Sequence, residues 1–198
     1  MRNEIKIKSN ILDHLNALKE KKLSKSFPDR KINSIYFDTH DFDYFKDGEE
    51  GTTPRVKVRY RWYDNNGFFN GYVELKKKNN FYSIKNRHKL KIYSNYDLRK
   101  KIIKITGKFL NPTLFVSYKR KYFVDTNGNR YTLDSNISYS SLSKSFLKTG
   151  FKKVSYSILE IKKNIDNISV DDISKFGPNV QRYSKYCEGI KYTSQSST

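Results

Sequence analysis

Residues Thr53–Tyr63 read Thr-Pro-Arg-Val-Lys-Val-Arg-Tyr-Arg-Trp-Tyr, and most of this stretch alternates cations with apolar side chains. Successive side chains of a β-strand point to opposite faces, so the stretch predicts a strand with one basic and one apolar face. The basic face carries Arg55, Lys57, Arg59 and Arg61, and the other carries Val56, Val58, Tyr60 and Trp62. At roughly 3.3 Å per residue the basic row is about 20 Å long, which suits a chain of phosphates. A solvated outer face would alternate in the same way, but arginine also favours forked phosphate contacts.

Other predicted strands also keep their ionisable residues on one parity. These residues are Glu4 and Lys6, then Glu74, Lys76 and Lys78, then Arg130 and Asp134, and finally Glu160 and Lys162. The apolar residues between them are Ile5, Ile7, Val73, Leu75, Tyr131, Leu133, Leu159 and Ile161. A charged face shared by so many strands can be hidden from bulk water only if the sheet curls, as it does in a barrel. We therefore predict a barrel with mixed charge inside, filled by water or anions, and an apolar face packed outward against helices.

Composition limits the class of protein. The 198 residues favour one domain with a substantial core, and 16 Tyr with 13 Phe favour a folded, β-rich chain over a disordered one. A formal net charge of +20 predicts a polyanionic partner, such as nucleic acid, an anionic membrane or a phosphate-rich small molecule. The single cysteine, Cys187, excludes an intrachain disulfide and indicates a reducing compartment. No long apolar stretch or signal peptide is recognised, so the sequence predicts a soluble, cytoplasmic protein without a membrane segment.

The order of patterns predicts one α+β domain of about seven or eight strands over residues 1–192, followed by a disordered tail at 193–198. Strands are expected at 2–8, 34–39, 53–63, 69–78, around 85–87, and at 114–125, 130–137 and 154–163. Helices are expected from a cap at Ser9 to near Leu23, after Ser94 as far as Gly107, and at 169–176. The segments around Pro28, at 41–51 and at 138–150 read as connections.

Eight short motifs, in order, carry a family resemblance. They are Arg2-x-Glu4-x-Lys6, Tyr36-Phe-Asp-Thr39, Lys57-x-Arg59-x-Arg61-x-Tyr63, Glu74-x-Lys76-x-Lys78, Tyr118-x-Arg120, Arg130-x-Thr-x-Asp134, Leu159-Glu-Ile-Lys162 and Ser184-Lys-Tyr186. Together, over essentially the whole chain, they resemble the vacuolar transporter chaperone (VTC) domain. That domain is a polyphosphate polymerase branch of the CYTH-like triphosphate tunnel metalloenzyme superfamily. The resemblance implies a closed antiparallel β-barrel of about eight strands with flanking helices and a basic tunnel.

The resemblance and the shared strand parity together assign roles to residues. The expected catalytic residues are Arg59, Arg61, Lys76 and Lys185. The expected phosphate or nucleotide contacts are Lys6, Arg55, Lys57, Lys78, Lys85, Arg87, Tyr118, Arg120, Arg130 and Lys162. Glu160 is expected to hold a divalent metal, Mn²⁺ or Mg²⁺, with Glu4, Glu74 and Asp134 as helpers.

The implied reaction transfers the γ-phosphoryl of ATP to a growing inorganic polyphosphate chain. Hydrolytic tunnel enzymes typically open with Glu-x-Glu-x-Lys, whereas Arg2 occupies the first position here, which favours transfer over hydrolysis. Two alternatives stay open: a hydrolase of inorganic triphosphate, a nucleoside triphosphate or an RNA 5′-triphosphate, and a non-catalytic polyanion-binding module. Beyond such an RNA end, no nucleic-acid signature is present.

Some conspicuous residues have plainer interpretations. His14, His40 and His88 have no cysteine partners and are predicted to lie at the surface. Tyr63, Tyr72, Tyr118 and Tyr122 could stack on an adenine base, but most tyrosines of such an aromatic sheet pack in its core. Asp38 is expected to end a strand.

Overall fold

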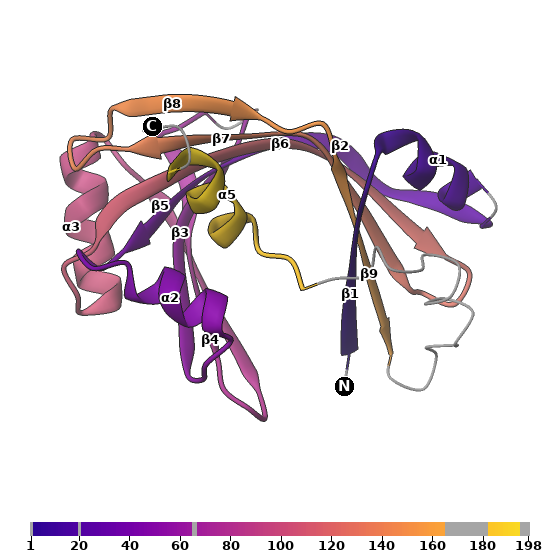
Figure 1. The fold of residues 1–198 in the computed structure, drawn as a ribbon, viewed down its shortest axis with the longest axis horizontal. Helices are drawn as coiled ribbons and strands as arrows, with labels where there is room; N and C mark the ends of the chain where they lie inside the picture. The colour runs from indigo at the N-terminus through magenta and orange to yellow at the C-terminus, as the bar shows by residue number, and fades with distance from the viewer. Residues whose placement is uncertain (1, 20, 65–66, 165–181, 195–198) are drawn as a thin grey trace. The chain divides into compact units, whose positions relative to one another are not determined.

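The computed structural model describes residues 2–19, 21–64, 67–164 and 182–194 (Figure 1). Within them the strands are β1 (Arg2–Ser9), β2 (Leu23–Asp38), β3 (Arg55–Tyr63), β4 (Asn70–Lys78), β5 (Ser83–Lys91), β6 (Asn111–Asp125), β7 (Arg130–Leu142), β8 (Lys148–Lys153) and β9 (Ser157–Asn164). The helices are α1 (Ile11–Lys19), α2 (Asp43–Glu50), α3 (Asn95–Thr106) and α5 (Lys185–Ser194). In the described part of the chain, no helix is long and apolar enough to cross a bilayer.

The strands form one mostly antiparallel sheet, which confirms the predicted α+β class. Its order is β1-β9-β7-β6-β2-β3-β4-β5, and β8 pairs with β7 beside this path. The two end strands of this order, β1 and β5, are not joined by hydrogen bonds within the described residues. Closure into a barrel therefore stays a prediction.

The chain divides into two compact units, each assembled from separated segments. The first comprises residues 1–31, 118–137 and 153–183, and the second comprises residues 32–117, 138–152 and 184–198. Neither unit is continuous in sequence, because β2, β6 and β7 each contribute residues to both. The single domain expected over 1–192 stays a prediction.

In the first unit, the predicted apolar parity forms the core. Ile7, Leu18, Tyr131, Leu133, Leu159 and Ile161 are buried together, and Ile5, Ile11 and Leu15 pack against them. Leu18 and its partly buried neighbours Ile11 and Leu15 come from α1, so this helix covers the apolar face of β1, β7 and β9. The expectation that the apolar face packs against a helix is confirmed here.

In the second unit, the apolar face of the opening stretch is also buried. Val58 and Tyr60 of β3 and Val73 of β4 are at most 1% exposed. Helix α3 begins as predicted, because the Ser94 side chain accepts a hydrogen bond from the Asp97 amide. It ends at Gly107, whose φ of 68° favours glycine, and it buries Leu98 and Ile102. Helix α2 contacts both β3 and α5.

Three expected connections are regular structure instead. Residues around Pro28 belong to the 16-residue strand β2, whose register with β3 covers only Ile32–Phe37. The proline thus lies in a part of the strand where β3 requires no amide donor. Helix α2 forms within 41–51 and ends at Gly51 in the left-handed region, a stop signal that its acidic composition obscured. Residues 138–142 extend β7, and β8 occupies 148–153.

Helix ends also differ from the sequence expectation. Helix α1 ends at Lys19, before Leu23, and the Asn10 side chain accepts the Asp13 amide hydrogen bond that was expected of Ser9. Thr193 and Ser194, expected in the tail, belong to α5. The helix predicted at 169–176 and the last four residues lie outside the described residues.

Candidate functional site

The register of β2, β3, β4 and β5 places the predicted basic residues in rows. Tyr36 lies opposite Arg59, Arg59 opposite Glu74, and Glu74 opposite Arg87. A neighbouring row contains Lys57, Lys76 and Lys85. The alternation read in the sequence therefore continues across adjacent strands of the second unit.

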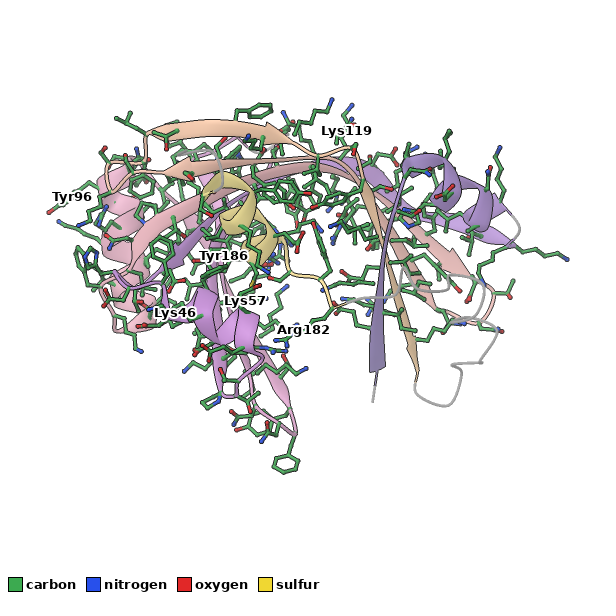
Figure 2. The ribbon with its side chains drawn as sticks, in the orientation of Figure 1. Lys46, Lys57, Tyr96, Lys119, Arg182 and Tyr186 are labelled. Atoms are coloured by element: carbon green, nitrogen blue, oxygen red, sulfur yellow. The ribbon has the colours of Figure 1, made fainter. Side chains whose placement is uncertain are left out.

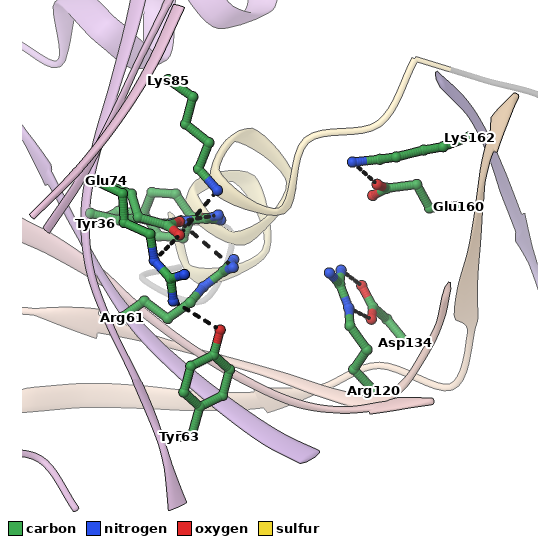
Figure 3. A network of polar contacts seen from close by, with 11 residues as sticks. Tyr36, Arg61, Tyr63, Glu74, Lys85, Arg120, Asp134, Glu160 and Lys162 are labelled. Carbon is green, nitrogen blue, oxygen red and sulfur yellow. Dashed lines mark hydrogen bonds and ion pairs between the residues drawn. The ribbon is translucent and has the colours of Figure 1, made fainter. Parts of the chain in front are cut away.

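Glu74 is the centre of what we call the cationic cluster, made of Arg59, Arg61, Glu74, Lys85 and Arg87. Arg59 binds its Oε2 atom through Nε at 2.7 Å and Nη2 at 2.5 Å, and Arg61 Nη1 lies 3.6 Å from the same oxygen. The Oε1 atom is 3.1 Å from Lys85 Nζ and 3.6 Å from Arg87 Nε (Figure 3). Four cations thus surround one carboxylate, which leaves a formal charge of +3.

Burial and charge oppose each other at Glu74. Its side chain is only 3% exposed, which by itself disfavours the ionised carboxylate. Arg59, Arg61 and Lys85 outweigh this and hold the pKa of Glu74 well below its usual range. For Lys85, burial lowers the pKa although Glu74 acts in the other direction. Such a cluster has spare positive charge for an incoming phosphate group.

A second layer of contacts fixes Arg59. Its Nη1 atom donates a hydrogen bond to Tyr36 Oη at 3.0 Å, and the Tyr36 ring stacks on Tyr186 with centroids 5.1 Å apart. Tyr186 Oη donates to buried Asp38 at 2.5 Å. Asp38 also accepts the amide hydrogens of Tyr44 and Phe45 at the start of α2. Tyr36, Asp38 and Tyr186 belong to the sequence motifs, but the sequence assigns no site role to either tyrosine and favours the end of a strand over metal ligation for Asp38.

The same layer attaches α5 to the sheet. Lys57 Nζ donates to Ser184 Oγ at 2.7 Å, one residue before α5 begins. Lys57 and Tyr186 of α5 are both labelled in Figure 2. Lys185 is the first residue of α5. Burial raises the pKa of Tyr36, but Arg59, Arg61 and, to a smaller extent, Lys185 lower it below its usual value. The motif Ser184-Lys-Tyr186 therefore connects the helix to the row of Tyr36 and Arg59.

Two tyrosines lie beside Arg87. Its guanidinium carbon is 3.6 Å from the centre of the Tyr72 ring, and Nη2 donates to Tyr63 Oη at 3.4 Å. The two rings pack edge to face with centroids 6.4 Å apart. Arg55 and Lys78 face each other across β3 and β4, at the end of this strand pair where β3 begins and β4 ends.

The first unit holds a different arrangement, the balanced cluster of Glu4, Lys6, Arg120, Asp134, Glu160 and Lys162. In the β1–β9 register, Glu4 lies opposite Lys162 and Lys6 opposite Glu160. Lys162 Nζ is 2.9 Å from Glu160 and 3.5 Å from Glu4, while Lys6 Nζ is 2.8 Å from Glu4. Burial raises the pKa of Glu160, but Arg120, Lys162 and Lys6 outweigh it, so that the pKa lies below its usual range.

Arg120 and Asp134 form a two-pronged ion pair. Arg120 Nε lies 2.5 Å from Oδ1 and Nη2 lies 2.7 Å from Oδ2 (Figure 3). Their side chains are 15% and 1% exposed. Burial alone would lower the pKa of Arg120, but Asp134 raises it well above its ordinary value. Tyr118, predicted to contact substrate, is 2% exposed and lies 5.4 Å from the Arg120 guanidinium. Arg130 lies opposite Lys162 and is exposed.

The four predicted metal ligands differ in their surroundings. Among the described residues, no three or more His, Cys, Asp or Glu side chains group so as to hold a metal ion. Glu74 and Asp134 are each bound by arginine, so their contacts favour positioning of the arginines over metal ligation. Glu160 and Glu4 share Lys162 and influence each other's ionisation. Mg²⁺ commonly takes one or two carboxylates and completes its coordination with substrate phosphates, so this pair fits such an ion.

One histidine was misjudged. His14 is 1% exposed, and its Nδ1 atom lies 2.7 Å from Ser157 Oγ, so the prediction of a surface residue is wrong. It sits on the face of α1 that packs on the sheet, a position that the spacing of Ile11, Leu15 and Leu18 could have indicated. Burial lowers the pKa of His14 to about 4. His40 and His88 are exposed, as expected.

Comparisons with known proteins agree with this fold. The family model of the VTC domain matches residues 2–194. No curated protein matches the sequence. A solved protein from Pyrococcus horikoshii has a TM-score of 0.56 and 16% identity, with coverage of 96% of this chain and 99% of its own.

Two further solved structures are similar at comparable levels. An adenylate cyclase candidate from Vibrio parahaemolyticus has a TM-score of 0.55 and 15% identity, covering 96% of this chain and 97% of its own. A Hippeastrum adenylyl cyclase candidate, described as having a dominant triphosphatase activity, has a TM-score of 0.51 and 13% identity. It covers 96% of this chain and 97% of its own. At these identities the likeness is one of fold.

Proposed function

We propose, from the premise that the chain belongs to the VTC domain family, that it is a metal-dependent polyphosphate polymerase that uses ATP. The observation that carries the proposal is the cationic cluster, in which four cations share the single carboxylate of Glu74. A phosphate chain carries about one negative charge per unit and matches this excess. The exposed Lys76 and Lys78 continue the basic row along the same strand.

In the proposed reaction, an oxygen of the terminal phosphate of the growing chain attacks the γ-phosphorus of ATP. The bond between that phosphorus and the β–γ bridging oxygen breaks, and ADP leaves with the bond's electron pair. Phosphoryl transfer needs positioning and charge neutralisation more than covalent work from the protein. Arg59 and Arg61, held by Glu74 and Tyr36, would bind the phosphoryl oxygens in a fixed orientation, with Lys76 and Lys185 as further cations.

Glu160 and Glu4 would hold the divalent ion, whose chemistry when bound is to neutralise phosphate oxygens as charge develops. Both carboxylates have a pKa below its usual range, so both are ionised at neutral pH. Lys162 and Lys6 lie against them and offset the repulsion between the two carboxylates. Arg120 lies near this pair and is itself oriented by Asp134.

Hydrolysis is the second candidate, and the Hippeastrum neighbour described as a triphosphatase favours it. The same cationic cluster would bind inorganic triphosphate, a nucleoside triphosphate or an RNA 5′-triphosphate, and water would replace the terminal phosphate as the attacking group. A polyanion-binding module without turnover is the third reading.

The deciding experiment incubates the protein with ATP and Mn²⁺, with Mg²⁺ in a parallel reaction. Products are separated on a polyacrylamide gel and identified by phosphorus NMR. Long phosphate polymer together with ADP supports the polymerase, whereas release of orthophosphate without polymer overturns it in favour of the hydrolase. Tight binding of tripolyphosphate without turnover of either kind supports the binding module.

A further inference from the structure

The hairpin formed by β4 and β5 ends in a turn with unusual side chains. Phe81 is 83% exposed, Tyr82 54% and Ile84 48%. Turn positions of tight hairpins normally carry Gly, Asn or Asp, which water solvates well, whereas a Phe there leaves a large apolar ring in water. Figure 1 shows this turn at one extremity of the second unit, away from α3.

The turn is held in one conformation in spite of its exposure. The Asn79 amide donates to the Tyr82 carbonyl at 2.9 Å, and the Asn79 side chain donates to Tyr82 Oη at 3.1 Å. Thr53, just before β3, donates a hydrogen bond to the Asn80 side chain. These hydrogen bonds constrain the turn that carries the exposed apolar groups, and such constraint lowers the entropic cost of binding through them.

Charge around the turn has one sign. From Leu75 to Tyr96 the chain has no Asp or Glu, while its cations are Lys76, Lys77, Lys78, Lys85, Arg87, Lys89 and Lys91. Lys77 lies opposite Ile84 in the register, on the face of the hairpin opposite to the row of Lys76 and Lys85. Lysines therefore lie near the turn on both faces of the hairpin: Lys77 on the face of Ile84, and Lys76 and Lys85 on the other face.

Three other exposed aromatic residues of the second unit have cationic neighbours. Lysine ammonium groups lie over the rings of Tyr93 and Tyr96, and the Arg99 guanidinium lies over Phe109. Within the described residues, Phe81 makes no ring–ring or cation–π contact, and neither does Phe151 of β8. Phe151 is 69% exposed and stands beside Lys152 and Lys153, which makes it a natural control.

We propose that the β4–β5 turn docks on an anionic lipid surface, with Phe81, Tyr82 and Ile84 entering the interface and the surrounding lysines contacting the headgroups. Aromatic and aliphatic side chains framed by Lys and Arg are typical of interfacial membrane anchors. Three side chains at the end of a turn are too few for a stable protein interface, which needs about 20 residues or more on each side. They also form no flat stacking platform of the kind that binds single-stranded nucleic acid.

The test is cosedimentation of the intact protein with vesicles of phosphatidylcholine mixed with phosphatidylserine, and with vesicles of phosphatidylcholine alone. Wild type should bind the mixed vesicles and not the neutral ones. Phe81→Ser should weaken binding to the mixed vesicles about tenfold, because one phenylalanine contributes on this order when it leaves water. Phe151→Ser, which removes another exposed ring next to lysines, should leave binding unchanged. Equal binding by wild type and Phe81→Ser would overturn the proposal, since charge alone would then explain the attachment.

A second measurement does not depend on a loss of binding. In Phe81→Trp, fluorescence should shift to shorter wavelength when mixed vesicles are added and should be quenched by brominated lipid. Wild type is the blank, because its only tryptophan, Trp62, is packed against Phe68. An unshifted spectrum contradicts insertion. If Phe81→Ser instead weakens binding to a single-stranded oligoribonucleotide, or turns a dimer into a monomer in light scattering, the surface belongs to nucleic acid or to a second copy.

Discussion

Around Glu74, four cations of β3 and β5 surround one carboxylate, whereas the balanced cluster of the first unit sets three cations against three carboxylates. Both clusters are built from alternate residues of antiparallel strands, and both contain a nearly buried acid bound by arginine. The formal charges nevertheless differ: +3 in the first case and zero in the second.

This difference suggests a division of labour. A cluster with excess positive charge is stabilised when an anion arrives, because the cations repel one another in its absence. A neutral cluster gains little from an anion alone, but its carboxylates can exchange a lysine for a divalent ion. A substitution in one cluster should therefore have a different effect from a substitution in the other.

The largest effect is expected for Glu160→Gln. Turnover of ATP with Mn²⁺ should fall about 1,000-fold, because a bound metal ion is worth several kcal/mol of transition-state stabilisation. Tripolyphosphate affinity, measured by calorimetry, should change less than about threefold, since the cationic cluster is intact. Full turnover in this variant would show that Glu160 is no metal ligand.

Asp134→Asn should reduce stability most. It leaves the buried Arg120 without its carboxylate, and breaking a buried ion pair on one side costs about 3 kcal/mol in the free energy of unfolding. Urea titration followed by circular dichroism measures this loss. Asp29→Asn is the matched control, because its pairing with Lys25 is exposed, and it should cost less than about 0.5 kcal/mol. Similar losses in both variants would mean that the Arg120 pair is not buried in solution.

Glu74→Gln should destabilise the protein by about 2 kcal/mol, less than Asp134→Asn because Lys85 and Arg87 are 48% and 43% exposed and keep part of their hydration. Saturating tripolyphosphate should restore most of the lost thermal stability by binding to the folded state. The same ligand should stabilise Asp134→Asn only as much as it stabilises wild type, because the cationic cluster of that variant still contains Glu74. Recovery of both variants to the same degree would remove the distinction between the two clusters.

Two neighbouring lysines of β4 test which face of the strand binds phosphate. Lys76→Ala should raise the dissociation constant for tripolyphosphate about tenfold, because Lys76 shares its row with Lys57 and Lys85. Lys77→Ala should leave it unchanged, because Lys77 points to the opposite face. Isothermal calorimetry measures both, and an equal loss would indicate binding through diffuse charge.

Acid should act on the first unit through His14. Its pKa is about 4 in the folded protein and near 6.5 when unfolded, so below pH 6.5 the unfolded state binds more protons. Stability should therefore fall as the pH drops from 7 toward 4, by about 1 kcal/mol at pH 5.5. Urea titrations at several pH values should show a smaller decline in the free energy of unfolding for His14→Gln than for wild type. His40→Gln, which changes an exposed residue, should show the same decline as wild type. An unchanged pH profile in His14→Gln would exclude this contribution.

The alternation of charged and apolar residues along the strands was the sequence feature that predicted the largest part of the structure. It identified the basic face of β3, the buried Val58 and Tyr60, and the apolar face that α1 covers in the first unit. The local cap signals at Ser94 and Gly107 of α3 are also confirmed, whereas the cap expected at Ser9 is wrong. These features depend on residues close together in the sequence, so they can be predicted from short stretches of it.

Other features depend on partners far away in the sequence. Residues around Pro28 read as a loop because local propensity does not show that β2 extends through them. The sequence predicts His14 at the surface because its partner, Ser157, lies 143 positions later. Tyr36 and Tyr186 are 150 positions apart, and nothing local indicates that their rings stack and support Arg59.

The sequence by itself determined which side chains share a face, because the two-residue period of a strand is a property of the backbone. It also determined the cationic excess and the family. Only the tertiary structure decided which cations surround which carboxylate, since strand register is set by pairing between distant segments. That pairing is what separates the cationic cluster around Glu74 from the neutral cluster around Glu160 and Asp134.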